Sequence, residues 1–264
     1  CTSDLNSRVA KYVHYLIDNT MENTFFKQHG YMHVKGLYND SALSAIRPIL
    51  DKFHNNWLRE NSLFYKTKAI NSSGLTASPW LTENEKLSLF HFINSTQLLN
   101  QVTSIIARPR FLNSQLFFNP YNPEQHNYWH RDSQYHLDIN AQQSALTGPE
   151  VLHCRIAFED ERGIELIPAS HKNWDSEEEL AVRLEQQGAH NYDSLSRGKT
   201  ISLQKGDLLI FSANMIHRGL YGLNRFSLDI LFFERHESVE QFINTDFLPT
   251  DAQLKKLENP AVFI

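Results

Sequence analysis

Apolar residues in the first hundred positions recur every three or four residues, which is the period of an amphipathic helix. Behind the capping residues Ser3 and Asp4, this pattern predicts a helix through Leu5, Val9, Val13 and Leu16. A second helix is expected to bury Leu43, Ile46, Leu50, Phe53 and Trp57 and to be kinked at Pro48. A third helical stretch begins at Thr82, which forms a capping box with Glu85, and carries Leu87, Phe90, Leu98, Val102 and Ile105. Between the first two helices, a short strand is expected at Tyr31–Val34.

From residue 111 the hydrophobic period changes to two, which is the period of a half-buried strand. The predicted strands are Arg110–Phe118, Val151–Phe158, Ile164–Ile167, Thr200–Leu203, Asp207–Phe211 and Arg225–Phe233, with a turn at Lys205-Gly206-Asp207. One helix interrupts them, capped by Ser176 with Glu179 and running to about Gln187. Helices followed by strands favour an antiparallel barrel or sandwich buttressed by N-terminal helices. We expect one domain over residues 1–264, helical to about residue 108 and β-rich over about 109–235.

The charge balance excludes several classes of protein. With 25 Lys and Arg against 30 Asp and Glu, the net charge is −5, so the chain lacks the basic field of a nucleic-acid or membrane-surface binder. No apolar run approaches the roughly 20 residues of a membrane-spanning helix, and the first residues lack the pattern of a signal peptide. We therefore expect a soluble, cytoplasmic protein that acts on a small molecule. No P-loop, GxSxG or CxxC motif is present.

Histidine is abundant and cysteine is rare, which favours a metal site with nitrogen and oxygen ligands. The chain has 13 histidines, whereas its two cysteines, Cys1 and Cys154, are far apart in sequence. In His130-Arg131-Asp132, the imidazole and the carboxylate project from one face of an extended backbone. With a second histidine they would form the 2-His-1-carboxylate triad that binds Fe(II). About 0.6 such pairs are expected by chance, and His136-Leu137-Asp138 is a second match.

The C-terminal half supplies the residues that could complete such a site. His217 follows an apolar strand and precedes a glycine-containing loop. Arg225 and Ser227 then share one face of the next strand, opposite Phe226, Leu228, Ile230 and Phe232. An inward guanidinium beside a hydroxyl could bind one carboxylate, such as the distal group of a dicarboxylic acid. The alternative is that Arg225 is an ordinary surface residue at the start of a strand.

Several motifs together resemble the phytanoyl-CoA dioxygenase family of Fe(II)/2-oxoglutarate oxygenases. They are WHRD at 129–132, GIELIPASH at 163–171, and the run from GDLLIF at 206–211 through His217 to RFS at 225–227, preceded by FFKQHGYMHVKGL at 25–37. The order and spacing match over roughly residues 25–233. The resemblance implies a double-stranded β-helix, also called a jelly roll or cupin-like fold. It also implies Fe(II), 2-oxoglutarate and O2 as cofactor and co-substrates.

Carried over to this chain, the resemblance makes His130, Asp132 and His217 the iron ligands. Arg225 and Ser227 would hold the C5 carboxylate of 2-oxoglutarate, and Gln115 matches a position that touches this co-substrate in relatives. His136 and Asp138 then fall in a loop near the substrate. The stretch from His217 to Arg225 is a few residues shorter than is usual in the family, and Ala169 stands where Gly is common. The carboxylate of Asp132 disfavours a halogenase, since halogenating relatives lack that group.

The substrate side is less defined by the sequence. His153 and Arg155 share a face of their strand, so they are expected to point into the barrel. A buried Arg155 needs an anionic partner, either Glu165 or an acidic group of a bound ligand. Together with Arg131 or Arg218, this favours hydroxylation of a small polar metabolite that carries an acidic group, with release of succinate and CO2. The alternatives are an acyl-CoA or natural-product intermediate as substrate, or a jelly-roll protein that binds metal or ligand without turnover. His153, Arg155 and His136 are the candidate substrate-binding residues.

For the remaining polar residues the ordinary structural interpretation is favoured. The run Glu177–Glu179 is expected to be the solvated first turn of a helix. Trp129 is expected to pack in the core, and His171 is not expected to bind metal. Ordinary core or surface roles are expected for His29, His33, His54 and His91.

Overall fold

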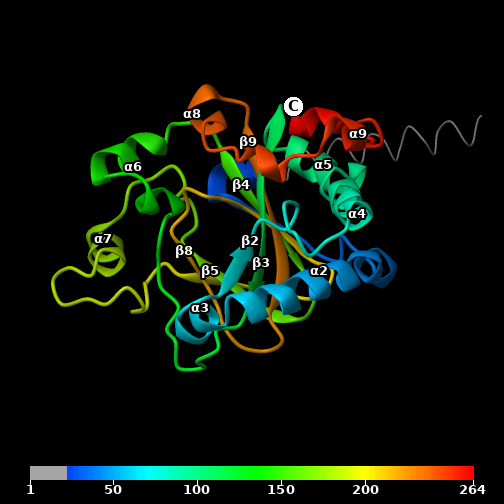
Figure 1. The fold of residues 1–264 in the computed structure, drawn as a ribbon. Coiled ribbons are helices and arrows are strands. Elements are labelled where there is room, and N and C mark those ends of the chain that lie inside the picture. The colour runs from blue at the N-terminus through cyan, green and yellow to red at the C-terminus, as the bar shows by residue number, and fades with distance from the viewer. Residues whose placement is uncertain (1–22) are drawn as a thin grey trace, which may run out of the picture.

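The structure is a computed structural model that describes residues 23–264 (Figure 1). The helix predicted through Leu5 lies outside the described residues. After a helical segment at 23–29, the helices are α2 Asp40–Glu60, α3 Ser62–Thr67, α4 Glu83–Ile93, α5 Thr96–Thr103, α6 Ile139–Ala145, α7 Glu177–Arg183, α8 Glu237–Glu240 and α9 Asp251–Leu254. The strands are β1 Tyr31–Val34, β2 Asn71–Ser73, β3 Pro109–Phe118, β4 Val151–Ala157, β5 Glu161–Leu166, β6 Lys199–Leu203, β7 Leu208–Ser212, β8 His217–Gly219 and β9 Phe226–Glu234. Short 3-10 helices occupy Asp132–Tyr135, Thr245–Phe247 and Pro260–Phe263.

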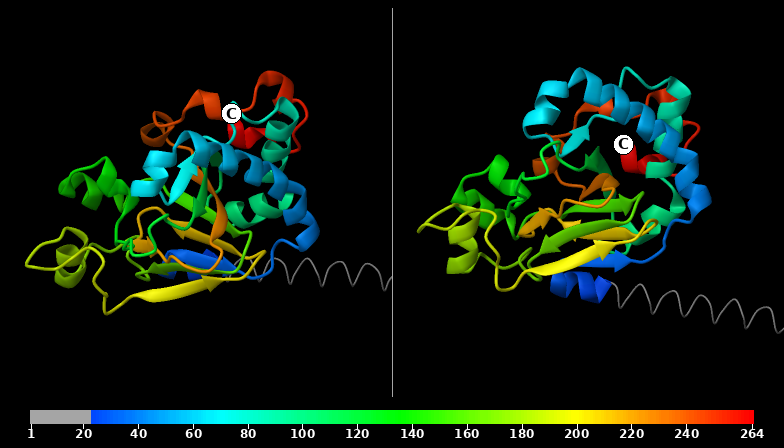
Figure 2. Two further views of the ribbon diagram at one scale, coloured as in Figure 1. Left: turned by 60° about the horizontal axis from the view of Figure 1, so that its bottom comes forward. Right: turned by 90° about the horizontal axis from the view of Figure 1, so that it is seen from below.

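The strands form two sheets in which every pairing is antiparallel. The larger sheet has the order β1-β7-β4-β9-β3-β2, and the smaller has the order β6-β5-β8. Figure 2 shows helices α2 and α4 over the strands on one side and the yellow strand β6 on the other. The prediction of a β-rich half built from antiparallel strands behind N-terminal helices is confirmed.

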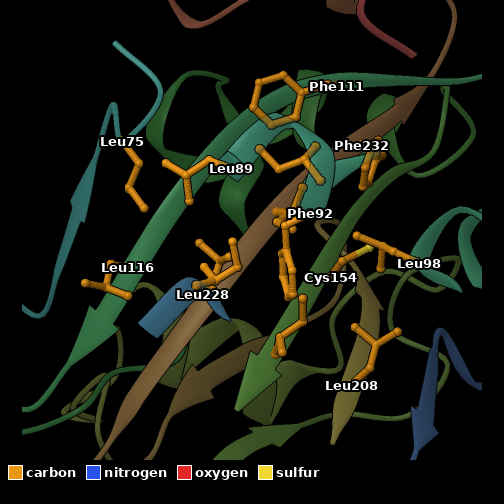
Figure 3. Packing of buried hydrophobic residues seen from close by; sticks show 14 of the residues in the cluster. Leu75, Leu89, Phe92, Leu98, Phe111, Leu116, Cys154, Leu208, Leu228 and Phe232 are labelled. Atoms are coloured by element: carbon orange, nitrogen blue, oxygen red, sulfur yellow. The ribbon is translucent and has the colours of Figure 1, made fainter. Parts of the chain in front are cut away.

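The main hydrophobic core lies between the larger sheet and the helices. Alternate residues of β9 point into it, including Leu228 and Phe232, and Cys154 of β4 packs beside them (Figure 3). Helices α4 and α5 supply Leu89 and Leu98 from the opposite side. Residues at i and i+2 of a strand lie on one face, so this alternation turns the intervening side chains of β4 and β9 away from the helices. The face opposite the helical core is therefore free to form a site.

The helices agree closely with the predicted periodicity. The five predicted core residues of α2 are all buried, and Pro48 lies inside the helix. Capping boxes are present at Thr82 and Ser176. The third stretch divides at Asn94–Ser95 into α4 and α5, and α7 ends at Arg183 rather than at Gln187.

The strands agree to within a few residues, apart from two short ones. β5 begins three residues before the predicted strand, and β2 and β8 were not predicted. Both are three residues long, too short for a period-two pattern to register. The predicted turn before β7 is present, with Gly206 at a φ of +91° that other residues rarely adopt. Within residues 23–264, no helix has the length and apolar character needed to span a bilayer.

Candidate metal centre

A cavity of about 550 Å³ lies between the two sheets, on the face of the larger sheet opposite the main hydrophobic core. β3, β4 and β9 contribute Gln115, Arg155 and Asp229, and the smaller sheet contributes Ile164 and Gly219. The full lining is Phe64, Lys68, Ala69, Ile70, Asn71, Gln115, Phe117, Tyr128, His130, Asp132, Tyr135, His136, His153, Arg155, Ile164, Phe211, His217, Gly219, Arg225, Asp229 and Leu231. Eight of the nine predicted site residues line this cavity, and Ser227 is the exception.

Backbone pairing brings the two candidate histidine ligands together. His130 and His217 form an antiparallel bridge in which each backbone N–H donates to the other's carbonyl, at 3.0 and 2.9 Å. Two residues on, the backbone N–H of Asp132 donates to the carbonyl of Ala213 at 3.2 Å and begins a short 3-10 helix. His130 and His217, 87 positions apart in the sequence, are therefore fixed side by side by main-chain hydrogen bonds.

The side chains of His130, Asp132 and His217 converge on one point. Their ligand atoms all lie within 4.8 Å of one another. Asp132 Oδ1 is 3.5 Å from His130 Nε2 and 3.7 Å from His217 Nε2. Within residues 23–264, no other three His, Cys, Asp or Glu side chains form such a group. The competing pair is not part of it, because Asp138 caps α6 by accepting from the Ala141 N–H at 2.8 Å.

Each histidine of the triad presents Nε2 to that point. His130 Nδ1 lies 3.1 Å from the Tyr128 carbonyl, and His217 Nδ1 lies 3.0 Å from the Met215 carbonyl. A carbonyl can only accept, so each Nδ1 carries the proton and each Nε2 keeps its lone pair. Burial and the neighbouring His130 lower the pKa of His217 to about 3, so that its imidazole is neutral near pH 7. Both rings are thus in the tautomer that a metal requires.

A histidine outside the triad, His153, forms a hydrogen bond with the carboxylate of Asp132. His153 Nε2 lies 2.6 Å from Asp132 Oδ2, and His153 Nδ1 lies 3.0 Å from Asp229 Oδ2. Burial disfavours the charged imidazole, but the carboxylates of Asp229 and Asp132 outweigh it and raise the pKa of His153 to about 10. His153 is therefore a buried cation between two carboxylates. Although it lines the cavity, both of its nitrogens are occupied, which leaves it no hydrogen bond for a substrate.

This donor set fits a single hard or borderline divalent metal. Two neutral imidazoles and one carboxylate oxygen face a common point from one side, which is the ligand set typical of non-haem Fe(II) sites. Among the described residues the one cysteine, Cys154, packs in the helical core and lies outside the cavity. The outer hydrogen bonds of all three ligands are also satisfied, as is usual around a bound metal.

Arg225 provides a cationic group in the same cavity. Its side chain is only 3% exposed, so the alternative of a surface arginine is wrong. Nη1 donates to the Phe118 carbonyl at 3.2 Å, whereas Nε and Nη2 have no partner among the described residues. The guanidinium lies between the rings of Phe117 and Tyr221, 5.3 and 5.2 Å from their centres. Burial and the nearby Arg155 lower the pKa of Arg225 to about 9, which leaves it charged near neutral pH. A buried cation with two unused donors is suited to an anionic ligand.

Arg155 is paired with an internal carboxylate, as one of the two alternatives expected, but the residue is Glu161 and not Glu165. Arg155 Nε donates to Glu161 at 2.8 Å, not to Glu165, and Glu165 instead pairs with Arg218 at 2.7 Å. Glu161 Oε2 also accepts from the Ser227 hydroxyl at 2.7 Å. Ser227 is fully buried and does not line the cavity, so its predicted contact with a carboxylate would require its hydroxyl to leave Glu161.

Arg131 and Arg218, which hinted at an acidic substrate, do not face the cavity. Arg131 is fully buried and binds Asp175 through Nε and Nη2 at 2.9 and 2.7 Å. Its other donors reach the carbonyls of Ser170, Asn173 and Asn214. Arg218 stacks on Trp129, 4.4 Å from the ring centre. These arginines hold the loops around the ligands in place, so the interpretation that they bind an acidic substrate group is wrong.

Other polar residues mostly have the expected ordinary roles. Trp129 is fully buried, and its Nε1 donates to the Asp193 carbonyl at 2.8 Å. His171 is buried away from the triad. In the glutamate run, Glu177 and Glu178 are exposed in the first turn of α7 as expected, whereas Glu179 is only 1% exposed and pairs with Arg197 at 2.9 Å.

Sequence reasoning missed Asp229 and Glu161. Asp229 lies two and four residues after Ser227 and Arg225, so the same alternation that selected them could have selected it. Glu161 begins a strand whose start was predicted three residues later, so its inward face was not recognised.

The fold and the site bring two histidines and a carboxylate to one point beside a buried arginine, an arrangement that could hold one divalent metal. The profile described as Phytanoyl-CoA dioxygenase (PhyH) matches residues 26–221, more than half of the chain. The chain belongs to the phytanoyl-CoA dioxygenase family. No curated protein sequence matches it.

Solved structures share the fold at low sequence identity. AviO1 from Streptomyces viridochromogenes Tue57 is 15% identical with a TM-score of 0.56, over 81% of this chain and 94% of that chain. Apo HygX from Streptomyces hygroscopicus is 12% identical with a TM-score of 0.59, over 81% and 85%. SnoN, a non-haem α-ketoglutarate-dependent epimerase of nogalamycin biosynthesis, is 13% identical with a TM-score of 0.52, over 83% and 81%. At these identities the likeness establishes the fold alone.

Proposed function

We propose that this protein is an Fe(II)/2-oxoglutarate-dependent dioxygenase that hydroxylates a C–H bond of a small polar metabolite and releases succinate and CO2. The observation that carries the proposal is the convergence of His130, Asp132 and His217, whose ligand atoms lie within 4.8 Å of one another. HygX has been solved with iron and with nickel and 2-oxoglutarate, which supports the same cofactor and co-substrate here. The two antiparallel sheets would be the walls of a double-stranded β-helix, within a single domain of residues 1–264.

In this proposal, His130, Asp132 and His217 hold the iron. Iron bound by three side chains would keep positions for 2-oxoglutarate and O2 and would supply the oxidising chemistry. The chain's contribution is to fix the ligands before the metal binds. Hydrogen bonds from Nδ1 to main-chain carbonyls orient both imidazoles, and His153 orients the carboxylate of Asp132. This preorganisation spares the protein the cost of ordering its ligands when the metal binds.

Arg225 would hold the distal carboxylate of 2-oxoglutarate. Its unused Nε and Nη2 can donate to the two oxygens of one carboxylate, and Phe117 and Tyr221 keep the guanidinium plane between them. Arg155 lies over the same Phe117 ring, at 4.8 Å, but Glu161 neutralises its charge. Arg225 is therefore the better of the two cations for a dianionic co-substrate. Gln115, which also lines the cavity, and Ser227 stay candidates for further contacts with it.

The walls of the cavity would keep water from the reacting centre. Phe117, Phe211, Ile164 and Leu231 line it together with the polar residues. Removing water strengthens the attraction between Arg225 and a carboxylate, because the local dielectric falls. His136 lies at the wall nearest α8, where its ring is stacked on Phe242 at 6.3 Å between centres, and would contact the substrate and not the metal.

Metal binding by two matched histidine variants tests the assignment of ligands. His217→Ala removes one of three ligands, so Co(II) binding measured by calorimetry should fall below detection. His136→Ala removes a cavity histidine outside the triad and should bind Co(II) as the wild type does. Equal losses in the two variants would refute the choice of the triad.

For the co-substrate, Arg225→Ala should raise the 2-oxoglutarate requirement strongly, and an unchanged requirement would contradict the role of Arg225.

A further inference from the structure

A second hollow of about 340 Å³ adjoins the metal cavity at the edge of the larger sheet. It lies where the edge strand β2 meets the end of α2 and the start of α3. Its lining is Trp57, Asn61, Phe64, Asn71, Ser72, Ser73, Asn113 and Gln115, which we call the amide groove. Phe64, Asn71 and Gln115 line both the groove and the metal cavity, so the two spaces are neighbours that share a wall.

The chemistry of the amide groove differs from that of the metal cavity. Six of its eight residues carry a neutral amide or hydroxyl, two are aromatic, and none is charged. Amides and hydroxyls each offer both a donor and an acceptor, as the hydroxyls of a carbohydrate or polyol do. A phosphate or carboxylate would find no cation in this lining, and an acyl chain would leave the polar atoms without partners.

Several of these polar atoms lack a partner within the protein. Ser72 is only 3% exposed, and its hydroxyl has no hydrogen bond among the described residues. Asn71 Nδ2 donates to Gln115 Oε1 at 2.8 Å, across the wall between the two spaces. That bond uses one polar atom of each amide and leaves Asn71 Oδ1 and Gln115 Nε2 without a described partner. A buried hydroxyl that is unsatisfied in the protein is usually satisfied by a ligand or by water.

Resting on the proposed function, we propose that the amide groove binds an uncharged, hydroxyl-rich part of the substrate. The substrate is then larger than the metal cavity alone would hold: its reacting carbon lies over the metal, and a sugar-like ring lies against Phe64 and the amides. The half-exposed ring of Phe64, 42% accessible, offers a flat apolar surface for the C–H face of such a ring. The groove thus selects neutral glycosides or polyols over anionic metabolites.

Binding of a simple neutral sugar tests the groove separately from catalysis. Methyl β-D-glucopyranoside is titrated into the full chain with Co(II) and 2-oxoglutarate, and its affinity is measured by saturation-transfer NMR. We expect millimolar binding that weakens about fivefold in Ser72→Ala, the effect of losing about one hydrogen bond. Ser114→Ala is the matched control: Ser114 is 2% exposed, its hydroxyl is also unpaired, and it lies on the neighbouring strand outside the groove. Its affinity should equal that of the wild type.

Three results would overturn the assignment of the groove. They are no binding of the glucoside to the wild type, an equal effect of the two serine variants, or tighter binding of glucose 6-phosphate or hexanoate that depends on Ser72. Succinate formation from 2-oxoglutarate is measured on the same samples. If succinate forms while the glucoside does not bind, the groove assignment fails and the proposed oxygenase function stands. If the glucoside binds as expected while no succinate forms, the proposed oxygenase function fails and the assignment of the groove stands.

Discussion

Replacing Asp229 with asparagine should weaken metal binding although Asp229 does not touch the metal position. Asp229 is 1% exposed, and its Oδ2 lies 3.0 Å from His153 Nδ1. The carboxylate compensates the charge of His153, whose other nitrogen holds Asp132. In Asp229→Asn the hydrogen bond can persist, but the charge of His153 is compensated by Asp132 alone. A divalent metal must then share that carboxylate with an uncompensated cation.

The size of the effect follows from the geometry. Two unit charges about 4 Å apart attract by about 4 kcal/mol at an effective dielectric constant of about 20, which sets the upper limit. The expected effect is smaller than this limit, because the hydrogen bond to His153 persists and because Asp229 acts on Asp132 only through His153. Outer partners of metal ligands typically change metal affinity about 10- to 100-fold, or about 1.4 to 2.7 kcal/mol. We expect Asp229→Asn to fall in that range.

Co(II) titration followed by calorimetry measures this effect, with Asp207→Asn as the matched control. Asp207 is also a buried aspartate, 3% exposed, and is 2.8 Å from a histidine, His33, but it lies outside the cavity. Both variants should lose stability, and only Asp229→Asn should lose metal affinity. Co(II) affinity within twofold of the wild type in Asp229→Asn, or an equal loss in the control, would refute the reasoning.

Two further predictions concern the co-substrate pocket and the pH dependence of stability. A Cβ at Gly219 would lie 2.5 Å from Arg225 Nη2, so Gly219→Ala should displace the guanidinium and raise the KM for 2-oxoglutarate about 10- to 100-fold in a succinate assay, with Co(II) binding intact; an unchanged KM would show that Arg225 does not bind the co-substrate. Burial lowers the pKa of His171 to about 4 from its ordinary 6.5. Because the unfolded chain then takes up a proton more readily than the folded one, the contribution of His171 to the free energy of unfolding is complete above pH 6.5. It is lost as the pH falls toward 4, by at most about 3 kcal/mol. Urea unfolding at pH 7 and pH 5 should therefore show a smaller drop in the free energy of unfolding for His171→Leu than for the wild type, and equal drops would contradict the assignment.

The parts of this structure that follow local periodicity were predictable from the sequence. The core face of α2, the capping boxes at Thr82 and Ser176, and the alternation of β9 all depend on residues close together in the chain. The alternation alone predicted that Arg225 faces the interior, and Arg225 does line the cavity. The division between α4 and α5 was missed, because the helical hydrophobic period continues across Asn94–Ser95.

Partners across sheets were not predictable in the same way. Arg155 was expected to need a buried anion, but the choice between Glu161 and Glu165 depends on the register and bulge of β5 against β6. The acid next to Arg131 in the sequence, Asp132, is not its partner, and the acid that it does bind, Asp175, is 44 positions away. The burial of His153 between Asp132 and Asp229 depends on three separate segments. Such pairings are fixed by tertiary geometry and leave no local pattern.

Conversion of 2-oxoglutarate to succinate tests the proposed chemistry. The wild-type chain is supplied with Fe(II), O2 and 2-oxoglutarate, with methyl β-D-glucopyranoside present and absent, and succinate and CO2 are quantified. We predict equal amounts of succinate and CO2 that require both Fe(II) and O2, and none from Asp132→Ala, which lacks the carboxylate of the triad. Absence of succinate from wild-type protein that has bound iron, or equal succinate from Asp132→Ala, would contradict the oxygenase function.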